Sequence, residues 1–537
     1  MFGAGGGTSS YEETRVADLI VLWGSNAREA HPIFFHHVLK AVQHGAKLMV
    51  VDPRRTPSAK WADLWLGIDV GTDIPLANAV GREIIVSGLA NEEFIARATT
   101  GYEEYRASVE PWTLEEAQRV TGVPADAIRE LAHAYAKADR AQLCWTLGIT
   151  EHHNAVDNVF ALINLALLCG HVGRYGSGLS PLRGQNNVQG GGDMGALPNK
   201  LPGFQDVEDD AARARFEATW NATIPPRNGM HLSEMFHAME SGELRALYVI
   251  GENPAQSEAD QQHAVKLLEG LDHLVVQDIV LTKTAQLADV VLPASASWAE
   301  AEGTVTSSER RVQRVRKALD PPGEARDDVE IVYELGKRLG VDLGSPRAED
   351  VWNELRSLSP MHAGMSYARL EELGGIQWPC WDETHAGDQF LHGRLWDDEV
   401  AVRAPFMAVE HDPPVDVLDD DFPIRLTTGR RLESFNTGVQ SNRYDSPLHV
   451  GGEAILLAPE DGERYGVADG SRVRVVSRRG SVEAPAQYDD TLRPGLAFMN
   501  LHFPDVVATN VLTIDATDPQ SGTAEFKATA IRLEPVA

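Results

Sequence analysis

Hydrophobic and polar positions follow the same order twice along the chain. In each copy, an apolar run of strand length leads to Gly-x-Asn, then to a helical stretch, and then to a second apolar run that ends in an acidic residue. Asn26 precedes Asp52 by 26 positions, and Asn253 precedes Asp278 by 25. This order is typical of a parallel βαβ unit, so the pattern predicts two related nucleotide-binding halves. The predicted strand-bearing segments are residues 17–26, 45–55 and 62–73, then 244–254, 272–285 and 288–297.

The two Gly-x-Asn sequences mark the predicted ligand-binding edge. Ligands of parallel sheets lie at the carboxyl ends of the strands, where Gly24 and Gly251 would allow a pyrophosphate to approach and Asp52 or Asp278 could bind a ribose or base. Neither half contains GxGxxG, so a plain NAD-binding fold is not favoured. A single Gly-x-Asn is more often only a turn, but its recurrence at matched spacing favours a ligand site. We therefore expect both asparagines to line one shared cleft, with the two acids nearby.

The remaining pattern predicts a helical middle and a β-rich end. Residues 122–138 are amphipathic, with Pro124 near the start, and residues 159–169 are apolar, so both are expected to be helices. Residues 404–423 are rich in proline and acids and are interpreted as a linker. Short β-branched segments after it predict a barrel. The predicted domains are 1–185, 186–403 with a helical extension, the linker at 404–423, and the barrel at 424–537.

Composition narrows the classes of function. The 537 residues carry a net charge of −31, which disfavours a nucleic-acid partner because such a partner requires basic surface. No segment approaches the roughly 18 apolar residues of a membrane span. The first residues lack the basic flank and apolar core of a secretory signal, so a cytoplasmic location is expected. Cys144, Cys169 and Cys380 are the only cysteines and are widely spaced, so neither a disulfide framework nor a four-cysteine metal site is expected.

One loop departs from the pattern of a core. Residues 183–195, RGQNNVQGGGDMG, combine five glycines, two glutamines and two asparagines behind Arg183. Glycine permits close main-chain approach to a large polar ligand, and a planar guanidinium can bind a carboxylate or phosphate through two parallel hydrogen bonds. The alternative is a glycine-rich surface loop with a solvated arginine.

Over nearly the whole chain, the sequence resembles the molybdenum- or tungsten-dependent formate dehydrogenases of the molybdopterin oxidoreductase family, and residues 183–195 match their loop almost letter for letter. The resemblance implies an α/β fold with two related Rossmann-like parallel-sheet domains and a C-terminal β-barrel. Two molybdopterin guanine dinucleotides carrying Mo or W would lie between the α/β domains and under the barrel. Formate would be oxidised to carbon dioxide, with two electrons passed to the metal centre and Arg183 holding the carboxylate. Nitrate-reducing members lack the arginine-led run, which favours formate.

The resemblance also assigns cofactor contacts, but no metal ligand, to residues of this chain. One dinucleotide would be bound by Trp23, Gly24, Ser25, Asn26, His31, Asp52, Arg54, Gly71 and Asp73. The other would be bound by Gly251, Glu252, Asn253, Ser257, Gln277, Asp278 and Thr282. The pterins would lie against Leu147, Gly148, Thr150, Thr428, Gly429 and Arg430, with Gly184 and Gln185 beside them. The barrel would add Asn510 and the EFK segment, in which Phe526 and Lys527 are the predicted contacts.

The family carries further parts ahead of its first strand: a four-cysteine iron–sulfur domain, a lysine on the electron path, and a metal-ligating cysteine or selenocysteine followed by histidine. None of them is found in this sequence. We expect that a segment ahead of Met1, or a separate electron-transfer polypeptide, supplies them, and that an iron–sulfur cluster belongs only there. The chain by itself is then expected not to oxidise formate, because it lacks the thiolate or selenolate ligand.

Two alternative functions stay open. Residues 436–443, NTGVQSNR, differ from the HTG-type stretch of many family members, so a related oxidoreductase for another small oxyanion is possible on this sequence. The absent metal ligand allows a non-catalytic pterin-fold scaffold subunit of an electron-transfer complex, although Arg183 argues against it. His152 and His153 are not favoured as metal ligands, because adjacent histidines point to different faces of most backbones.

Overall fold

The first body is a five-stranded parallel sheet. The computed structural model describes residues 1–443 and 452–536, so residues 444–451 and 537 of the predicted barrel domain lie outside the described residues. The sheet has the order β3-β2-β1-β5-β6, and every neighbouring pair is parallel. Its strands are β1 (Leu19–Trp23), β2 (Lys47–Val51), β3 (Leu64–Leu66), β5 (Ala141–Trp145) and β6 (Gly178–Pro181). The first predicted set of strands is confirmed.

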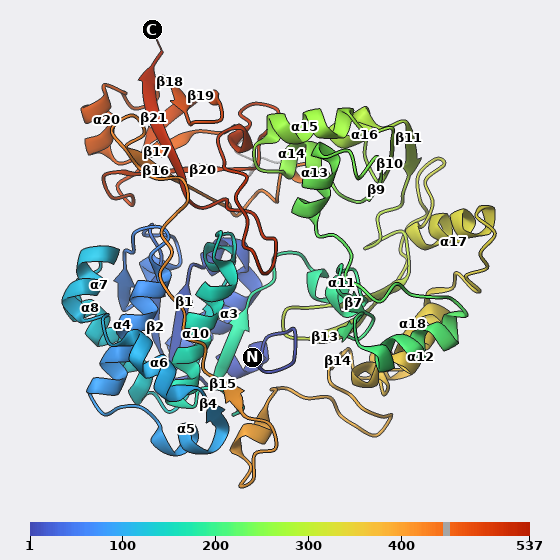
Figure 1. Ribbon diagram of the computed structural model, residues 1–537, viewed down its shortest axis with the longest axis horizontal. Coiled ribbons are helices and arrows are strands. Elements are labelled where there is room, and N and C mark those ends of the chain that lie inside the picture. Colours follow the sequence, from blue (N-terminus) through green and yellow to red (C-terminus); the bar gives the residue numbers. More distant parts are fainter. Residues whose placement is uncertain (444–451, 537) are drawn as a thin grey trace.

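Helices cover both faces of this sheet (Figure 1). Alternate residues of β1 enter different cores: Val21 belongs to one hydrophobic cluster and Leu22 belongs to another. A buried strand alternates in this way because successive side chains point to opposite faces. The helices are α4 (Asp73–Val86), α8 (Ala125–Lys137) and α10 (Ala155–Cys169) on one side, and α3 (Pro32–Gln43) on the other. Helices α8 and α10 confirm the two helices expected at 122–138 and 159–169.

The second body is a smaller parallel sheet with the order β11-β10-β9. Its strands are β9 (Ala246–Ile250), β10 (His273–Asp278) and β11 (Val290–Pro293), and α13 (Leu232–Glu240), α15 (Gln261–Glu269) and α16 (Lys283–Leu287) accompany them. Strands β9, β10 and β11 correspond in order to β1, β2 and β3 of the first sheet. The repeated hydrophobic pattern therefore corresponds to a repeated structure.

A third body contains an antiparallel sheet that the sequence analysis did not anticipate. Strand β13 (Arg311–Val315) pairs with β12 (Gly303–Thr306) and β14 (Ile376–Gln377). Helices α11 (Val188–Asp193) and α18 (Ala348–Leu358) contact this sheet, and α12 (Asp210–Trp220) lies near α18 in Figure 1. Helix α17 (Asp328–Arg338) stands apart from the sheet at the right edge of the picture. Arg310, which is fully buried, fastens the N-terminal residues to this body, because its guanidinium donates to the carbonyl oxygens of Gly7 (2.7 Å) and Gln389 (2.7 Å).

A closed six-stranded barrel completes the fold and confirms the predicted β-rich end. Its order is β16-β20-β17-β19-β18-β21. The strands are β16 (Ile424–Gly429), β17 (Ile455–Leu457), β18 (Arg472–Val476), β19 (Ser481–Tyr488), β20 (Leu496–Asn500) and β21 (Thr529–Pro535). The long connection between β20 and β21, dark red in Figure 1, leaves the barrel and descends between the two parallel-sheet bodies.

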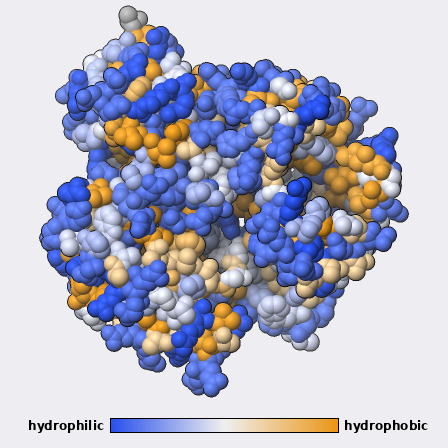
Figure 2. All heavy atoms as spheres, viewed as in Figure 1, coloured by the Kyte–Doolittle hydropathy of each residue, from blue (hydrophilic) through white to orange (hydrophobic). Residues whose placement is uncertain are grey.

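Figure 2 shows a face covered mainly by hydrophilic residues. Among the described residues, no helix is both long and apolar enough to cross a membrane.

The segment leading to the barrel is fastened to the first body by Asn164. Its buried side chain donates to the Met407 carbonyl oxygen (2.7 Å) and accepts from the Met407 N–H (3.1 Å). We expect Asn164→Ala to lower the free energy of unfolding by about 1–3 kcal/mol, because it leaves buried polar groups of Met407 without partners. Urea unfolding measures the change. Asn353→Ala, at an exposed position of α18, is the control, and an equal loss in both variants would contradict the assignment.

Candidate active site

A large cavity lies between the two parallel-sheet bodies and the barrel. Its volume is about 970 Å³, at the upper end of the range typical of small-molecule sites. Asn26 and Asp52 line it from the first sheet, and Asn253 and Asp278 line it from the second. The expectation that the matched strand ends face one cleft is confirmed.

The cavity wall contains most of the residues predicted to bind cofactor. They are Gly24, Asn26, His31, Asp52, Arg54, Gly71, Asp73, Leu147, Gly148, Gly184, Gln185, Gly251, Glu252, Asn253, Ser257, Asp278, Thr282, Thr428, Gly429, Arg430, Asn510, Phe526 and Lys527. The structure thus brings together residues that are up to five hundred positions apart in the sequence.

Four predicted cofactor residues do not line the cavity. Trp23 lies in the core and its indole N–H donates to Asp73 Oδ1 (2.8 Å), so it holds a residue that lines the wall. Ser25 is fully buried beside Gly24. Gln277 is buried and bonded to Tyr248 and Asp328. Thr150 is partly exposed on the short helix α9 (Leu147–Thr150).

The asparagines of the two Gly-x-Asn sequences form equivalent hydrogen bonds in the two halves. Asn26 Oδ1 accepts a hydrogen bond from the Ser58 hydroxyl (3.1 Å), and Asn253 Oδ1 accepts one from the Thr284 hydroxyl (2.9 Å). Each asparagine therefore ties the loop after the first strand of its half to the segment after the second strand. The two halves therefore share a loop geometry, and this explains why the Gly-x-Asn sequence recurs at matched spacing.

The glycines of the same sequences differ between the halves. Both have a positive φ, +58° at Gly24 and +66° at Gly251, a conformation that favours glycine. A Cβ on Gly24 would lie 2.8 Å from the backbone carbon of Gly148, whereas a Cβ on Gly251 would have no heavy atom within 4 Å. Gly24 thus permits contact between two segments of the protein, and Gly251 borders open space.

Of the two acidic residues at the strand ends, Asp52 is buried and Asp278 is half-buried. Burial raises the pKa of Asp52 to about 6, against the opposing effect of the Arg54 guanidinium. Asp52 Oδ1 also accepts the Arg54 N–H (2.9 Å), and the Arg54 guanidinium stacks 3.5 Å from the centre of the Phe498 ring of the barrel. Burial likewise raises the pKa of Asp278. Both carboxyls line the cavity, where a polar ligand could form hydrogen bonds with them.

Arg183 lies behind the cavity wall. Its neighbours Leu182, Gly184 and Gln185 line the cavity, but its guanidinium bonds to Gln189 Oε1 (3.2 Å) and to the Gly5 carbonyl oxygen (3.1 Å). The Arg183 carbonyl oxygen accepts a hydrogen bond from His31 Nε2 (2.7 Å), so His31 joins the arginine loop to the cavity wall.

Comparisons with known proteins place the chain in a family. The family model for molybdopterin oxidoreductases matches residues 6–338, and that for the molybdopterin dinucleotide-binding domain matches residues 424–530. The chain belongs to the molybdopterin oxidoreductase family. The alpha subunit of an F420-dependent formate dehydrogenase from Methanocaldococcus jannaschii is 41% identical over 537 residues, which are 99% of this chain and 79% of that protein.

Other relatives agree with this family. Formate dehydrogenase H of Escherichia coli is 37% identical over 540 residues, which are 100% of this chain and 75% of that protein. The solved structure of acetylene hydratase from Pelobacter acetylenicus matches with a TM-score of 0.77 at 20% identity, over 99% of this chain and 79% of that chain. It confirms the α/β fold with a C-terminal barrel.

The cavity suits the molybdopterin cofactor of this family. Two buried polar atoms on residues that line it, His31 Nδ1 and Asn510 Oδ1, have no hydrogen-bond partner among the described residues. Buried polar atoms of this kind normally have partners, so a polar ligand in the cavity would satisfy them. The open space beside Gly251 leaves room for the same ligand.

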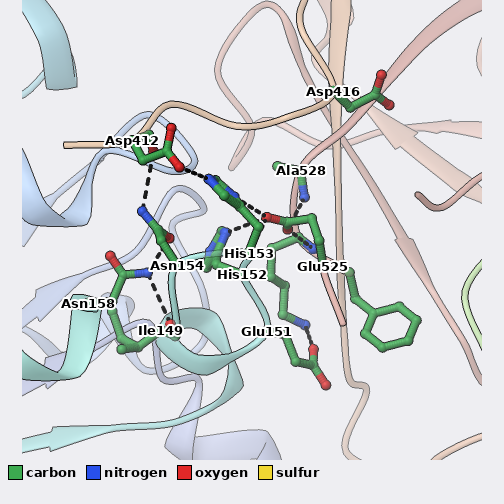
Figure 3. A network of polar contacts seen from close by, with 12 residues as sticks. Ile149, Glu151, His152, His153, Asn154, Asn158, Asp412, Asp416, Glu525 and Ala528 are labelled. Carbon is green, nitrogen blue, oxygen red and sulfur yellow. Dashed lines mark hydrogen bonds and ion pairs between the residues drawn. The ribbon is translucent and has the colours of Figure 1, made fainter. Parts of the chain in front are cut away.

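A buried carboxylate fastens the barrel to the first body in this member of the family (Figure 3). Glu525 Oε2 contacts Nδ1 of both His152 and His153 at 3.3 Å, and Oε1 accepts the N–H groups of Lys527 (2.9 Å) and Ala528 (3.0 Å). The expectation that the two adjacent histidines point to different faces is wrong, because both imidazole rings contact Glu525 Oε2. Among the described residues, no group of three or more His, Cys, Asp or Glu side chains could hold a metal ion.

The electrostatics favour a charged junction. Burial opposes ionisation of Glu525, but the His152 and His153 rings and the His153 N–H outweigh it and hold the pKa of Glu525 far below its usual range. Burial lowers the pKa of His152, but Glu525 and Asp73 outweigh it and raise the pKa overall. The hydrogen bond to Glu525 raises the pKa of His153. Of the EFK segment, the two predicted contacts Phe526 and Lys527 line the cavity, whereas Glu525 does not.

We expect Glu525→Gln to destabilise the closed junction by about 3–5 kcal/mol near pH 6, because removing one partner leaves buried charge uncompensated. The raised histidine pKa values mean that this contribution is present below their unfolded value of 6.5 and lost as the pH rises through the folded values. The lowered Glu525 pKa means that it is also lost in strong acid. Thermal melting at several pH values, with Glu534→Gln on β21 as control, measures this. A difference from wild type that does not shrink above neutral pH would contradict the charged junction.

Proposed function

We propose that the chain is the catalytic core of a formate dehydrogenase that oxidises formate to carbon dioxide and passes two electrons to a metal centre. The proposal rests on the Arg183-led loop at the wall of the shared cavity, in a chain that is 37–42% identical to formate dehydrogenase alpha subunits or formate dehydrogenase H over its whole length. The cofactor would be two molybdopterin guanine dinucleotides with Mo or W.

The matched halves suggest how the two dinucleotides divide between the bodies. Asp52 and Arg54 would bind one of them at the first sheet, and Asp278 and Thr282 would bind the other at the second. Lys527, whose ammonium is 2.6 Å from Glu151 Oε2, would contact the pterins from the barrel. When bound, the group supplies two-electron redox chemistry, and the protein supplies orientation and electrostatics.

Arg183 would hold the substrate. Its Nε and Nη2 atoms are bonded to the protein, and Nη1 has no hydrogen bond to the described residues. The Nη1 and Nη2 edge is therefore available to bind the two carboxylate oxygens of formate, with parallel charge-assisted hydrogen bonds. Such a clamp restricts the rotation of a very small substrate, so that its C–H bond keeps one direction. Carbon dioxide carries no charge, so the same clamp releases the product.

Partners follow from the relatives. Because these include proteins named as alpha subunits, we extend the proposal to an electron-transfer partner subunit and, on the sequence expectations above, to a cytoplasmic location. An iron–sulfur cluster would belong to protein outside residues 1–537.

A related oxidoreductase for another oxyanion is the second candidate. Asn436, Thr437, Val439 and Gln440 come from the segment that departs from the pattern of many family members, and all four line the cavity. The holoenzyme should reduce a dye with formate as donor. Turnover of nitrate with no turnover of formate would favour this second candidate.

We expect substitution of Arg183 to impair formate binding in the holoenzyme. Arg183→Lys keeps the charge but loses the planar fork, and Arg183→Ala loses both. Removing a charged hydrogen-bond partner costs about 1.5–3 kcal/mol, so kcat/KM for formate should fall roughly tenfold to a hundredfold with metal and pterin content unchanged. If Arg183→Ala loses pterin together with activity, Arg183 only braces its loop. Wild-type kinetics in Arg183→Ala would refute both roles.

A further inference from the structure

Asp193 lies at the end of a chain of hydrogen bonds that leads to Arg183. The Asp193 side chain is fully buried, at 0% exposure. One of its oxygens, Oδ2, accepts the indole N–H of Trp378 (2.8 Å), and the other, Oδ1, accepts from Gln189 Nε2 (2.9 Å). Gln189 is one turn before Asp193 on α11, and Trp378 belongs to the third body.

The donors and acceptors of this chain allow only one arrangement when Asp193 is ionised. An ionised carboxylate only accepts hydrogen bonds, and the indole nitrogen only donates. Gln189 must therefore turn its NH₂ group to Asp193, and this same orientation turns its Oε1 to Arg183 Nε at 3.2 Å. The opposite orientation would place an NH₂ donor against the guanidinium, which also only donates.

The same amide holds the arginine from a second direction. Gln189 Nε2 and Arg183 Nη2 both donate to the Gly5 carbonyl oxygen, at 3.0 and 3.1 Å. The N-terminal segment can approach this closely because residue 5 is glycine, where a Cβ would lie 2.3 Å from the Phe204 ring. Two of the three guanidinium nitrogens are thus placed by Gln189 and its neighbours, and the Nη1 edge is left for a ligand.

We propose that Asp193 is a positioning residue that sets the orientation of the Gln189 amide and thereby aims the Arg183 guanidinium at the substrate carboxylate. The inference rests on the proposed function, because it assumes that Arg183 binds formate. An asparagine at position 193 that accepts from Trp378 would have to turn its NH₂ group to Gln189, so the NH₂ group of Gln189 would meet a donor in place of an acceptor. The negative charge of Asp193 is therefore needed to fix the orientation of the Gln189 amide. A side chain of the same size without the charge would not fix it.

A dependence on pH follows from the same geometry. Burial raises the pKa of Asp193 to about 6, against the lowering effects of its two hydrogen bonds and of the charges on Arg183 and Arg310. Once protonated, Asp193 can donate, so it no longer requires the NH₂ group of Gln189, and the amide keeps its orientation only through Arg183 and the Gly5 carbonyl oxygen. Affinity for formate should then fall as the pH drops below about 6. Formate itself stays ionised in that range, since simple carboxyl groups titrate near pH 4.

The test uses the holoenzyme and formate kinetics, with bound metal and pterin measured on every sample. Asp193→Asn should raise KM for formate about tenfold with kcat changed less than about twofold, because the lost orientation affects binding of the carboxylate. Gln189→Met, which keeps the length of the side chain but removes the amide, should raise KM to a similar extent. Asp210→Asn, on an exposed acid of α12, is the matched control and should leave KM unchanged.

A double-mutant cycle tests whether Asp193 acts through Arg183. In an Arg183→Lys background, Asp193→Asn should change KM by less than about twofold, since residues that act in one network are not additive. In wild type, KM should rise below about pH 6, and in Asp193→Asn it should be flat across the same range.

The outcomes separate this inference from the proposed function. If Arg183→Ala raises KM while Asp193→Asn and Gln189→Met leave it unchanged, the positioning role is wrong and the proposed function stands. If none of the variants changes KM, or if no form of the holoenzyme turns over formate, both are wrong. Loss of pterin in Asp193→Asn, with a flat wild-type pH profile, would show a structural role only. If Asp193→Asn fails to fold, KM of Gln189→Met and the pH dependence of KM in wild type test the positioning role. An unchanged KM in Gln189→Met together with a flat wild-type profile would contradict it.

Discussion

Glu525 is a buried carboxylate that accepts hydrogen bonds from both sides of the contact between the barrel and the first parallel sheet. The cavity exists only while this contact is closed, because the segments on either side of Glu525 and His152 supply part of its wall. Burying a carboxylate is unfavourable unless it is paired and hydrogen-bonded, so the junction has one stable arrangement, with both histidine rings turned to Glu525. A ligand enclosed by three bodies requires such a fastening.

The two halves contribute to the cavity through the same loop geometry. In each half, an asparagine after the first strand binds a hydroxyl side chain after the second, Ser58 in one half and Thr284 in the other. The repeated Gly-x-Asn sequence therefore reflects the hydrogen bond that holds each loop at the carboxyl end of its sheet. The ligand contacts themselves can differ, since Gly24 is packed against Gly148 and Gly251 is open.

Local pattern was enough to predict the parallel strands, the amphipathic helices and the barrel, because alternation, strand length and glycine positions are properties of neighbouring residues. Resemblance to a family added the residues around the cavity. The pairing of His153 with Glu525 spans 372 positions, and no periodicity indicates such a contact. The antiparallel sheet of the third body was missed because its strands are short and because helices separate β14 from β13 along the chain. The hydrogen bond between Gln189 and Asp193 was not predicted, because the glycine-rich loop that contains both residues was interpreted from its backbone.

The proposed function requires one cavity to hold two guanine dinucleotides, one at each parallel sheet. Acid hydrolysis of the purified holoprotein, followed by quantification of released GMP against protein and metal, tests this directly. We expect two GMP and one Mo or W per chain. A single GMP per chain would contradict the division of the cofactor between the two halves, and none would contradict the dinucleotide site itself.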